Sequence, residues 1–71
     1  MDFKEKRFVG SFLIDCGKVD VEIENVGGWW QVVSTYPNGE VYCQRYMSRL
    51  AAVTEAMNAV NRGRSAEKLF S

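Results

Sequence analysis

Apolar and polar residues alternate most regularly in residues 19–24, where valine or isoleucine holds each odd position and aspartate or glutamate each even one. A period of two residues is that of a β-strand with one face in a core and the other in water. Runs rich in β-branched and aromatic residues at 7–14, 29–36 and 41–46 predict three more strands. The chain before residue 47 is therefore expected to form strands joined by short turns.

A different period begins at residue 48. Apolar and small residues recur there at helical spacing, at Leu50, Ala52, Val53, Ala56, Met57, Ala59 and Val60. Ser48 suits the N-cap and Gly63 the C-cap, so we expect the helix to lie between them. Leu50 and Met57 are expected in the core. One further turn in residues 65–70 would fold Leu69 and Phe70 back onto that core.

The turn at residues 37–39 decides how the last two strands pair. A two-residue Asn-Gly loop would pair Tyr36 with Val41. A type I turn opened by Pro37 and followed by a glycine bulge would instead pair Tyr36 with Glu40. We favour the bulged turn, because proline suits the second position of a type I turn. A one-residue shift here changes which faces of the two strands coincide.

These elements predict an α+β fold: a four-stranded antiparallel meander sheet with one C-terminal α-helix packed on one face (ββββα). We expect residues 1–71 to form a single domain. A chain of this length buries only about 60% of the surface that its unfolded form exposes, so its core is thin. Association with another chain is the expected remedy, because the sequence indicates neither several disulfides nor a metal.

Cysteine and histidine usage argues against a metal site. The chain has two cysteines, Cys16 and Cys43, and no histidine, which is too few ligands for zinc. We expect reduced thiols, with Cys43 packed as a small hydrophobe. A disulfide between Cys16 and Cys43 is the less favoured alternative. No cofactor, membrane span or signal peptide is indicated, so we expect a cytoplasmic protein.

Aromatic and acidic residues are the candidates for a contact surface. Trp29 and Trp30 are consecutive in a strand, so they point to opposite faces, and one of them should be exposed. Exposed tryptophan is enriched at the energetic centre of protein interfaces. We predict that another protein, or a second copy in a homodimer, is bound by a surface that combines Trp29, Tyr42, Asp20, Glu22 and Glu24.

Two other function classes rank lower. The net charge is zero, but acidic residues concentrate in 15–40 and basic residues in 41–71. Nucleic-acid binding through a basic helix end and sheet tyrosines is the alternative, with the candidates Arg45, Arg49, Arg62 and Arg64. Nucleic-acid domains usually carry a strong basic excess, which this chain lacks. An enzyme is not indicated, because no nucleophile, base or glycine-rich loop converges on the acidic strand.

Residues 30–60 combine a hairpin with a serine-capped helix. Asn-Gly-Glu forms the turn, Tyr46 and Ser48 lie at the helix start, and Ala52 and Val60 lie within the helix. This segment resembles the strand-strand-helix module of the YegP-type bacterial proteins. The resemblance implies a small dimeric bacterial domain and transfers no catalytic residue. The element order is also similar to that of single-strand-binding coactivator domains, without their basic sheet face. Size and compactness favour a bacterial or phage accessory protein.

Overall fold

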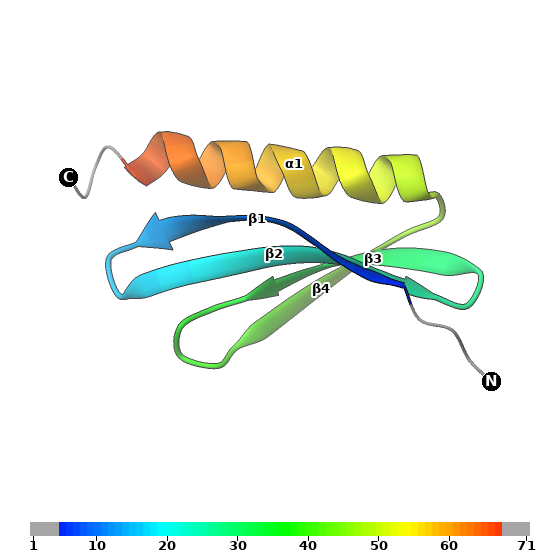
Figure 1. Ribbon diagram of the computed structural model, residues 1–71, viewed down its shortest axis with the longest axis horizontal. Helices are drawn as coiled ribbons and strands as arrows, with labels where there is room; N and C mark the ends of the chain where they lie inside the picture. Colours follow the sequence, from blue (N-terminus) through cyan, green and yellow to red (C-terminus); the bar gives the residue numbers. More distant parts are fainter. Residues whose placement is uncertain (1–4, 68–71) are drawn as a thin grey trace.

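The computed structural model describes residues 5–67. Its elements, in chain order, are β1 (Lys6–Ile14), β2 (Gly17–Val26), β3 (Trp29–Thr35), β4 (Val41–Tyr46) and α1 (Arg49–Ala66). The strands form one antiparallel sheet in the order β1-β2-β3-β4, and α1 packs on one face of it (Figure 1). The predicted ββββα meander is therefore confirmed. The predicted contacts of Leu69 and Phe70 lie outside the described residues.

The turn between β3 and β4 adopts the bulged form. Tyr36 N donates to Glu40 O at 2.8 Å, and Gly39 N donates to Tyr36 O at 3.0 Å. Gly39 has a φ of 91°, a left-handed conformation that residues with a Cβ resist. Asn38 Oδ1 accepts from Glu40 N at 2.9 Å and closes the turn. Tyr36 therefore pairs with Glu40, as the favoured turn predicted.

α1 begins where the sequence predicts but continues past its predicted end. Ser48 Oγ accepts from Ala51 N at 3.1 Å, which confirms Ser48 as the N-cap. The helix then continues through Gly63 to Ala66, so the predicted C-cap at Gly63 is wrong. Gly63 instead lies against the ring of Phe12, which occupies the space that a Cβ at this position would need.

The core lies between α1 and the sheet. Its clustered buried side chains are Val21, Ile23, Val32, Ala52, Ala56 and Val60. Small residues of α1 face the sheet, so the helix approaches β1 closely: a Cβ at Gly10 would stand 3.1 Å from Val60 Cγ1. This orientation turns Leu50 and Met57 outward, with exposed fractions of 77% and 53%. Their predicted core positions are therefore wrong.

α1 covers the sheet unevenly. It lies alongside β1 and makes its least extensive contact with β4 (Figure 1). The α1 side of β4 is therefore partly open, and none of the described elements covers the reverse face of the sheet. In the described part of the chain, no helix has both the length and the apolar character that crossing a membrane requires.

Candidate interaction surface

The acidic row (Asp20, Glu22 and Glu24) lies on the reverse face of the sheet, because the residues that alternate with it are buried under α1. Each of its carboxylates has a partner nearby. The pairs are Lys18–Asp20 (Nζ to Oδ1, 3.8 Å), Lys6–Glu22 (Nζ to Oε1, 3.7 Å) and Gln31–Glu24 (Nε2 donating to Oε1, 2.6 Å). Residues 5–67 contain no group of three side chains that could hold a metal ion. The row is therefore a half-buried strand face whose charge Lys6 and Lys18 partly neutralise.

Trp29 and Arg45 form a second feature of the reverse face. Trp30 packs against the core, so its neighbour Trp29 points away from α1. With its amide oriented to satisfy its partners, Asn25 accepts from Trp30 Nε1 at 3.2 Å. Arg45 Cζ lies 4.0 Å from the centroid of the Trp29 ring, within cation–π range. Trp29 is thus the tryptophan of the reverse face, where Arg45 covers one side of its ring. Trp29 and Trp30 are both half-buried, so the prediction that one of them is exposed is wrong.

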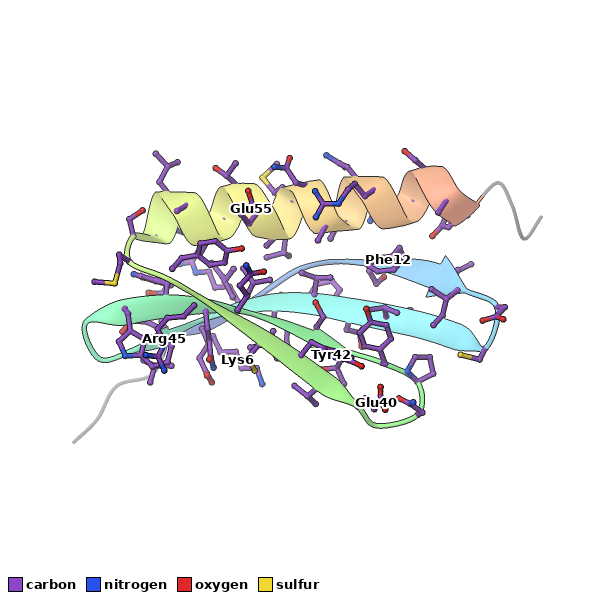
Figure 2. All side chains as sticks on the ribbon, turned by 180° about the vertical axis from the view of Figure 1, so that it is seen from behind. Lys6, Phe12, Glu40, Tyr42, Arg45 and Glu55 are labelled. Atoms are coloured by element: carbon purple, nitrogen blue, oxygen red, sulfur yellow. The ribbon has the colours of Figure 1, made fainter. Side chains whose placement is uncertain are left out.

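Tyr42 lies on the α1 side of the sheet, because its cross-strand partner Ser34 pairs with a core residue of β2. Its ring meets the ring of Tyr36 edge-on, with centroids 5.1 Å apart, and its hydroxyl donates to Glu40 Oε2 at 2.9 Å (Figure 2). The hydrogen bond and the negative charge of Glu40 raise the pKa of Tyr42 above its ordinary value. The predicted contact surface is therefore split, since Tyr42 lies across the sheet from Trp29 and the acidic row.

A groove of about 290 Å³ runs between α1 and β4. Its walls include Tyr42, Gln44 and Tyr46 of β4 and Glu55, Ala59 and Arg62 of α1. Burial raises the pKa of the Tyr46 hydroxyl, and the Glu55 carboxylate adds to this effect while Arg62 opposes it. Because the α1 wall carries one negative and one positive side chain, the groove presents no single charge to a ligand.

The arginines of the nucleic-acid hypothesis do not gather on one surface. Arg45 lies on the reverse face. Arg49 lies on the α1 side, with its Cζ 5.8 Å from the centroid of the Trp30 ring. Arg62 lines the groove beside β4, and Arg64 bonds to β1 at the opposite flank of the helix. Tracking a phosphate backbone requires several cations along one surface. Within the described residues, the structure shows no surface on which these four arginines lie together, so nucleic-acid binding stays a prediction.

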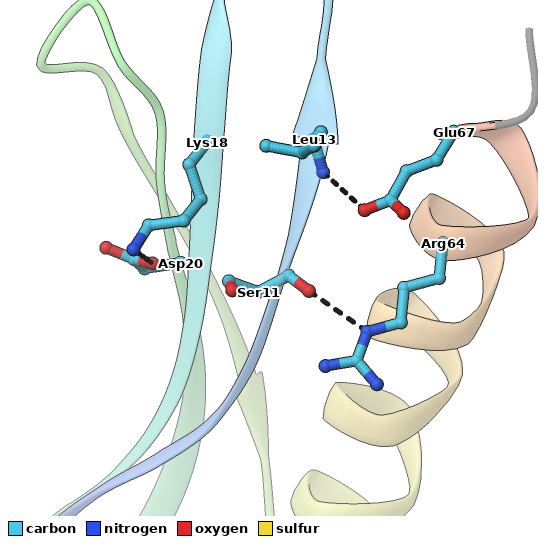
Figure 3. A network of polar contacts seen from close by, with 6 residues as sticks. All are labelled: Ser11, Leu13, Lys18, Asp20, Arg64 and Glu67. Carbon is cyan, nitrogen blue, oxygen red and sulfur yellow. Dashed lines mark hydrogen bonds and ion pairs between the residues drawn. The ribbon is translucent and has the colours of Figure 1, made fainter. Parts of the chain in front are cut away.

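Two side chains from the end of α1 cover the outer edge of β1. Arg64 Nε donates to Ser11 O at 3.1 Å, and Leu13 N donates to Glu67 Oε1 at 2.7 Å (Figure 3). These backbone groups point away from β2 and have no strand to pair with. A bulge in residues 8–10 interrupts β1 as well. Bulges and covering side chains are means by which proteins blunt a sheet edge.

The outer edge of β4 has no such cover. The hydrogen bond that closes the β3–β4 turn fixes the alternation of the ladder, and it directs the backbone N–H and C=O groups of Val41, Cys43 and Arg45 outward. In residues 5–67, none of the side-chain or turn hydrogen bonds reaches those groups. The exposed fractions of Val41 and Tyr42 are 54% and 58%. β4 is therefore an open edge strand.

Sequence reasoning did not identify this edge as a candidate site. The predicted meander already placed residues 41–46 outermost in the sheet. These residues contain no proline and no lysine, the residues that commonly protect an edge strand. An outermost strand without protective residues was therefore a signal in the sequence. The prediction instead relied on the side chains of tryptophan and the carboxylates.

Both cysteines are free and exposed. The prediction that Cys43 packs as a small hydrophobe is therefore wrong, because Cys43 belongs to an edge strand that no described element covers. Cys16 lies in the turn between β1 and β2, and the two thiols do not pair.

Comparison with protein-family models, with curated proteins and with solved structures finds no match for this chain. The resemblance of residues 30–60 to YegP-type proteins has no counterpart in these comparisons.

Proposed function

We propose that this chain is a non-enzymatic protein-binding domain that accepts an extended strand of its partner along the outer edge of β4. The observation that carries the proposal is the contrast between the two sheet edges. Arg64 and Glu67 cover the edge of β1, whereas the outward backbone groups of β4 have no partner among the described residues. Such a row of unpaired groups is a template for another strand.

Strand addition would supply both affinity and specificity. Backbone hydrogen bonds give the affinity, and the side chains that alternate along the edge choose the partner. Next to this edge, Arg45 lies against the ring of Trp29, so an arginine and a tryptophan are held together on the reverse face. These two residue types dominate the energetic centres of interfaces. The proposal therefore keeps the predicted role of Trp29 and adds the backbone of β4.

A cytoplasmic location belongs to the same proposal. Cys16 and Cys43 are free and exposed. Exposed free thiols are maintained in reducing compartments, whereas secreted small domains are usually stapled by disulfides.

Substitutions at Cys43 test the proposal. Cys43→Pro removes an outward N–H while sparing the hydrogen bonds to β3, and proline is tolerated at such edge positions. Cys43→Ala removes the thiol and keeps the N–H, so it is the matched control. Proteins captured from the native host and identified by mass spectrometry should be retained by Cys43→Ala and lost by Cys43→Pro. Circular dichroism and thermal melting establish that both variants are folded.

Equal capture by the two variants would reject an edge-strand mechanism. Oligonucleotide binding is the competing outcome, and it should fall steeply as salt rises if arginines contact phosphates. Absence of oligonucleotide binding at about 50 mM salt would remove the nucleic-acid hypothesis.

A further inference from the structure

We propose that the strand bound at the β4 edge is β4 of a second copy of this chain, paired antiparallel about a two-fold axis with Cys43 opposite Cys43. This inference rests on the proposed function, because it names the partner of the same edge. A two-fold interface uses the same surface on both copies and closes on itself. The outer edges of the joined sheet would then be the two β1 strands, which Arg64 and Glu67 cover. Assembly would stop at a dimer.

The direction of the backbone groups selects the register. Val41, Cys43 and Arg45 face outward, so a pairing centred on Cys43 sets all three against outward-facing residues of the second copy. This register forms about six backbone hydrogen bonds, two for each such pair. A register centred on Tyr42 or on Gln44 aligns only two of the three outward residues, so it forms about four.

Side chains on the reverse face suit this register. Arg45 comes opposite Val41 of the second copy, so the two arginines do not meet. Like charges directly opposite each other would destabilise the pairing. On the α1 side, Tyr42 comes opposite Gln44 of the second copy, which pairs an aromatic ring with an uncharged side chain. No position in the ladder sets equal charges against each other.

Charge complementarity at the ends of the ladder favours a second copy as the occupant. In this register Glu40 lies opposite Tyr46 of the second copy, beside the point where its α1 begins. The first turn of α1 holds Arg49 and no acidic residue. The N-terminus of a helix attracts negative charge, so each copy offers a carboxylate where the other offers a cation and a positive helix end. The two-fold axis repeats this contact at both ends.

The size of the chain favours the same occupant. With 71 residues, one copy buries a thin core. Pairing would cover Val41 and Tyr42, two of the most exposed large side chains of β4. The net charge is zero, so no overall repulsion opposes the approach of two copies.

Sedimentation of the full chain gives the first test. We expect the wild type and Cys43→Ala to sediment with twice the mass of one 8.1 kDa chain, and Cys43→Pro with the mass of one chain. Amide hydrogen exchange of the wild type adds a measurement that needs no variant. The amides of Val41, Cys43 and Arg45 should become protected as protein concentration rises, whereas the covered amide of Leu13 should not change. A wild-type monomer at every concentration, or a dimer that Cys43→Pro leaves intact while its fold is retained, overturns the inference.

Thiol cross-linking tests the register. In the Cys16→Ser variant, Cys43 is the remaining cysteine, and the two Cys43 Cα atoms should lie about 5.5 Å apart in a hydrogen-bonded pair. A short bismaleimide should then join two copies covalently. The Cys43→Ser variant, which retains Cys16 in the distant β1–β2 turn, should give no covalent dimer. A dimer that cross-links through Cys16 and not through Cys43 would reject the two-fold pairing.

The two proposals can fail separately. If the chain is monomeric and Cys43→Ala captures a host protein that Cys43→Pro loses, β4 pairs with a strand of another protein and only the second-copy inference fails. If the chain is monomeric and both variants capture the same proteins, the edge mechanism itself fails.

Discussion

The two edges of this sheet are treated in opposite ways. At β1, the helix supplies an acceptor to Leu13 N and a donor to Ser11 O, and a bulge interrupts the strand. At β4, the outward backbone groups meet no other described element, and nearly every residue is exposed. One helix on this four-stranded sheet therefore covers one edge and leaves the other edge open.

Close packing between α1 and β1 explains why the β1 edge is the covered one. Gly10 and Gly63 leave room for Val60 and Phe12, so β1 and α1 come together more closely than residues with a Cβ would allow. That approach brings Arg64 and Glu67 within hydrogen-bonding distance of β1. Because α1 lies against β1, it makes its least extensive contact with β4, and the groove beside Tyr46 remains open.

Disrupting the close approach of α1 to β1 should have a large effect on stability. Gly63→Ala gains about 1 kcal/mol of helix propensity, but the added Cβ displaces the ring of Phe12. Overpacking of this kind costs about 1–3 kcal/mol, so we expect a net loss of stability. Each kcal/mol lowers the Tm of a domain this small by about 4–8 °C, which thermal melting would measure.

Two further variants test whether the stability loss in Gly63→Ala comes from the contact with Phe12. Asn58→Ala, at an exposed position of the same helix, should leave the Tm unchanged or raise it slightly. Phe12→Leu combined with Gly63→Ala should recover part of the loss, since the smaller side chain relieves the overlap. A higher Tm for Gly63→Ala alone would show that the glycine is not needed for packing.

Uncovering the β1 edge should have a smaller effect. Glu67→Ala removes the acceptor of Leu13 N, and Arg64→Ala removes the donor to Ser11 O. Each loss should cost about 0.5–1.5 kcal/mol or less, because water reaches these exposed groups. Hydrogen exchange at the Leu13 amide should become faster in Glu67→Ala and stay near the wild-type rate in Arg64→Ala. Equal rates in Glu67→Ala and wild type would contradict the cover.

Uncovering the β1 edge should also change the size of the assembly. If an open edge recruits a strand, the double variant Arg64→Ala and Glu67→Ala gives the sheet two open edges. If the wild type stops at a dimer, as proposed, the double variant should form species larger than a dimer. Light scattering of the two proteins at equal concentration measures the difference, and identical size distributions would show that side-chain cover does not control assembly.

The smallest expected effect concerns Tyr42 beside the open edge. Glu40→Gln weakens the hydrogen bond that Tyr42 donates to residue 40 and removes the negative charge there, the two main causes that raise the pKa of Tyr42, so that pKa should fall toward its ordinary value of about 10. A raised pKa in the folded state gives stability that is present below about pH 10 and is lost as pH rises through the folded pKa. The alkaline side of the stability profile should therefore depend less on Tyr42 in Glu40→Gln. Nuclear magnetic resonance titration of the labelled tyrosine rings measures the pKa directly, and an unchanged value for Tyr42 would contradict the contact with Glu40.

The strands, the bulged turn and the helix start follow from the amino-acid sequence alone. These features depend on neighbours in the chain: the alternation of residues 19–24, the proline and glycine of the turn, and the hydroxyl of Ser48. Local periodicity and capping express the preferences of a few adjacent residues, so they can be read without knowing the fold. The opposite directions of Trp29 and Trp30 followed in the same way.

Which face of the helix is buried and which edge of the sheet is open depend on the packing of distant segments. Leu50 and Met57 have the spacing of core residues, yet the small stripe of Ala52 and Ala56 lies against the sheet. Gly63 has the sequence signature of a helix end, yet it accommodates Phe12 from β1. Both outcomes depend on how closely two distant surfaces fit, and a periodic pattern does not contain that information. The same fit left β4 uncovered, whereas the strand register divided the predicted contact residues between the two faces of the sheet.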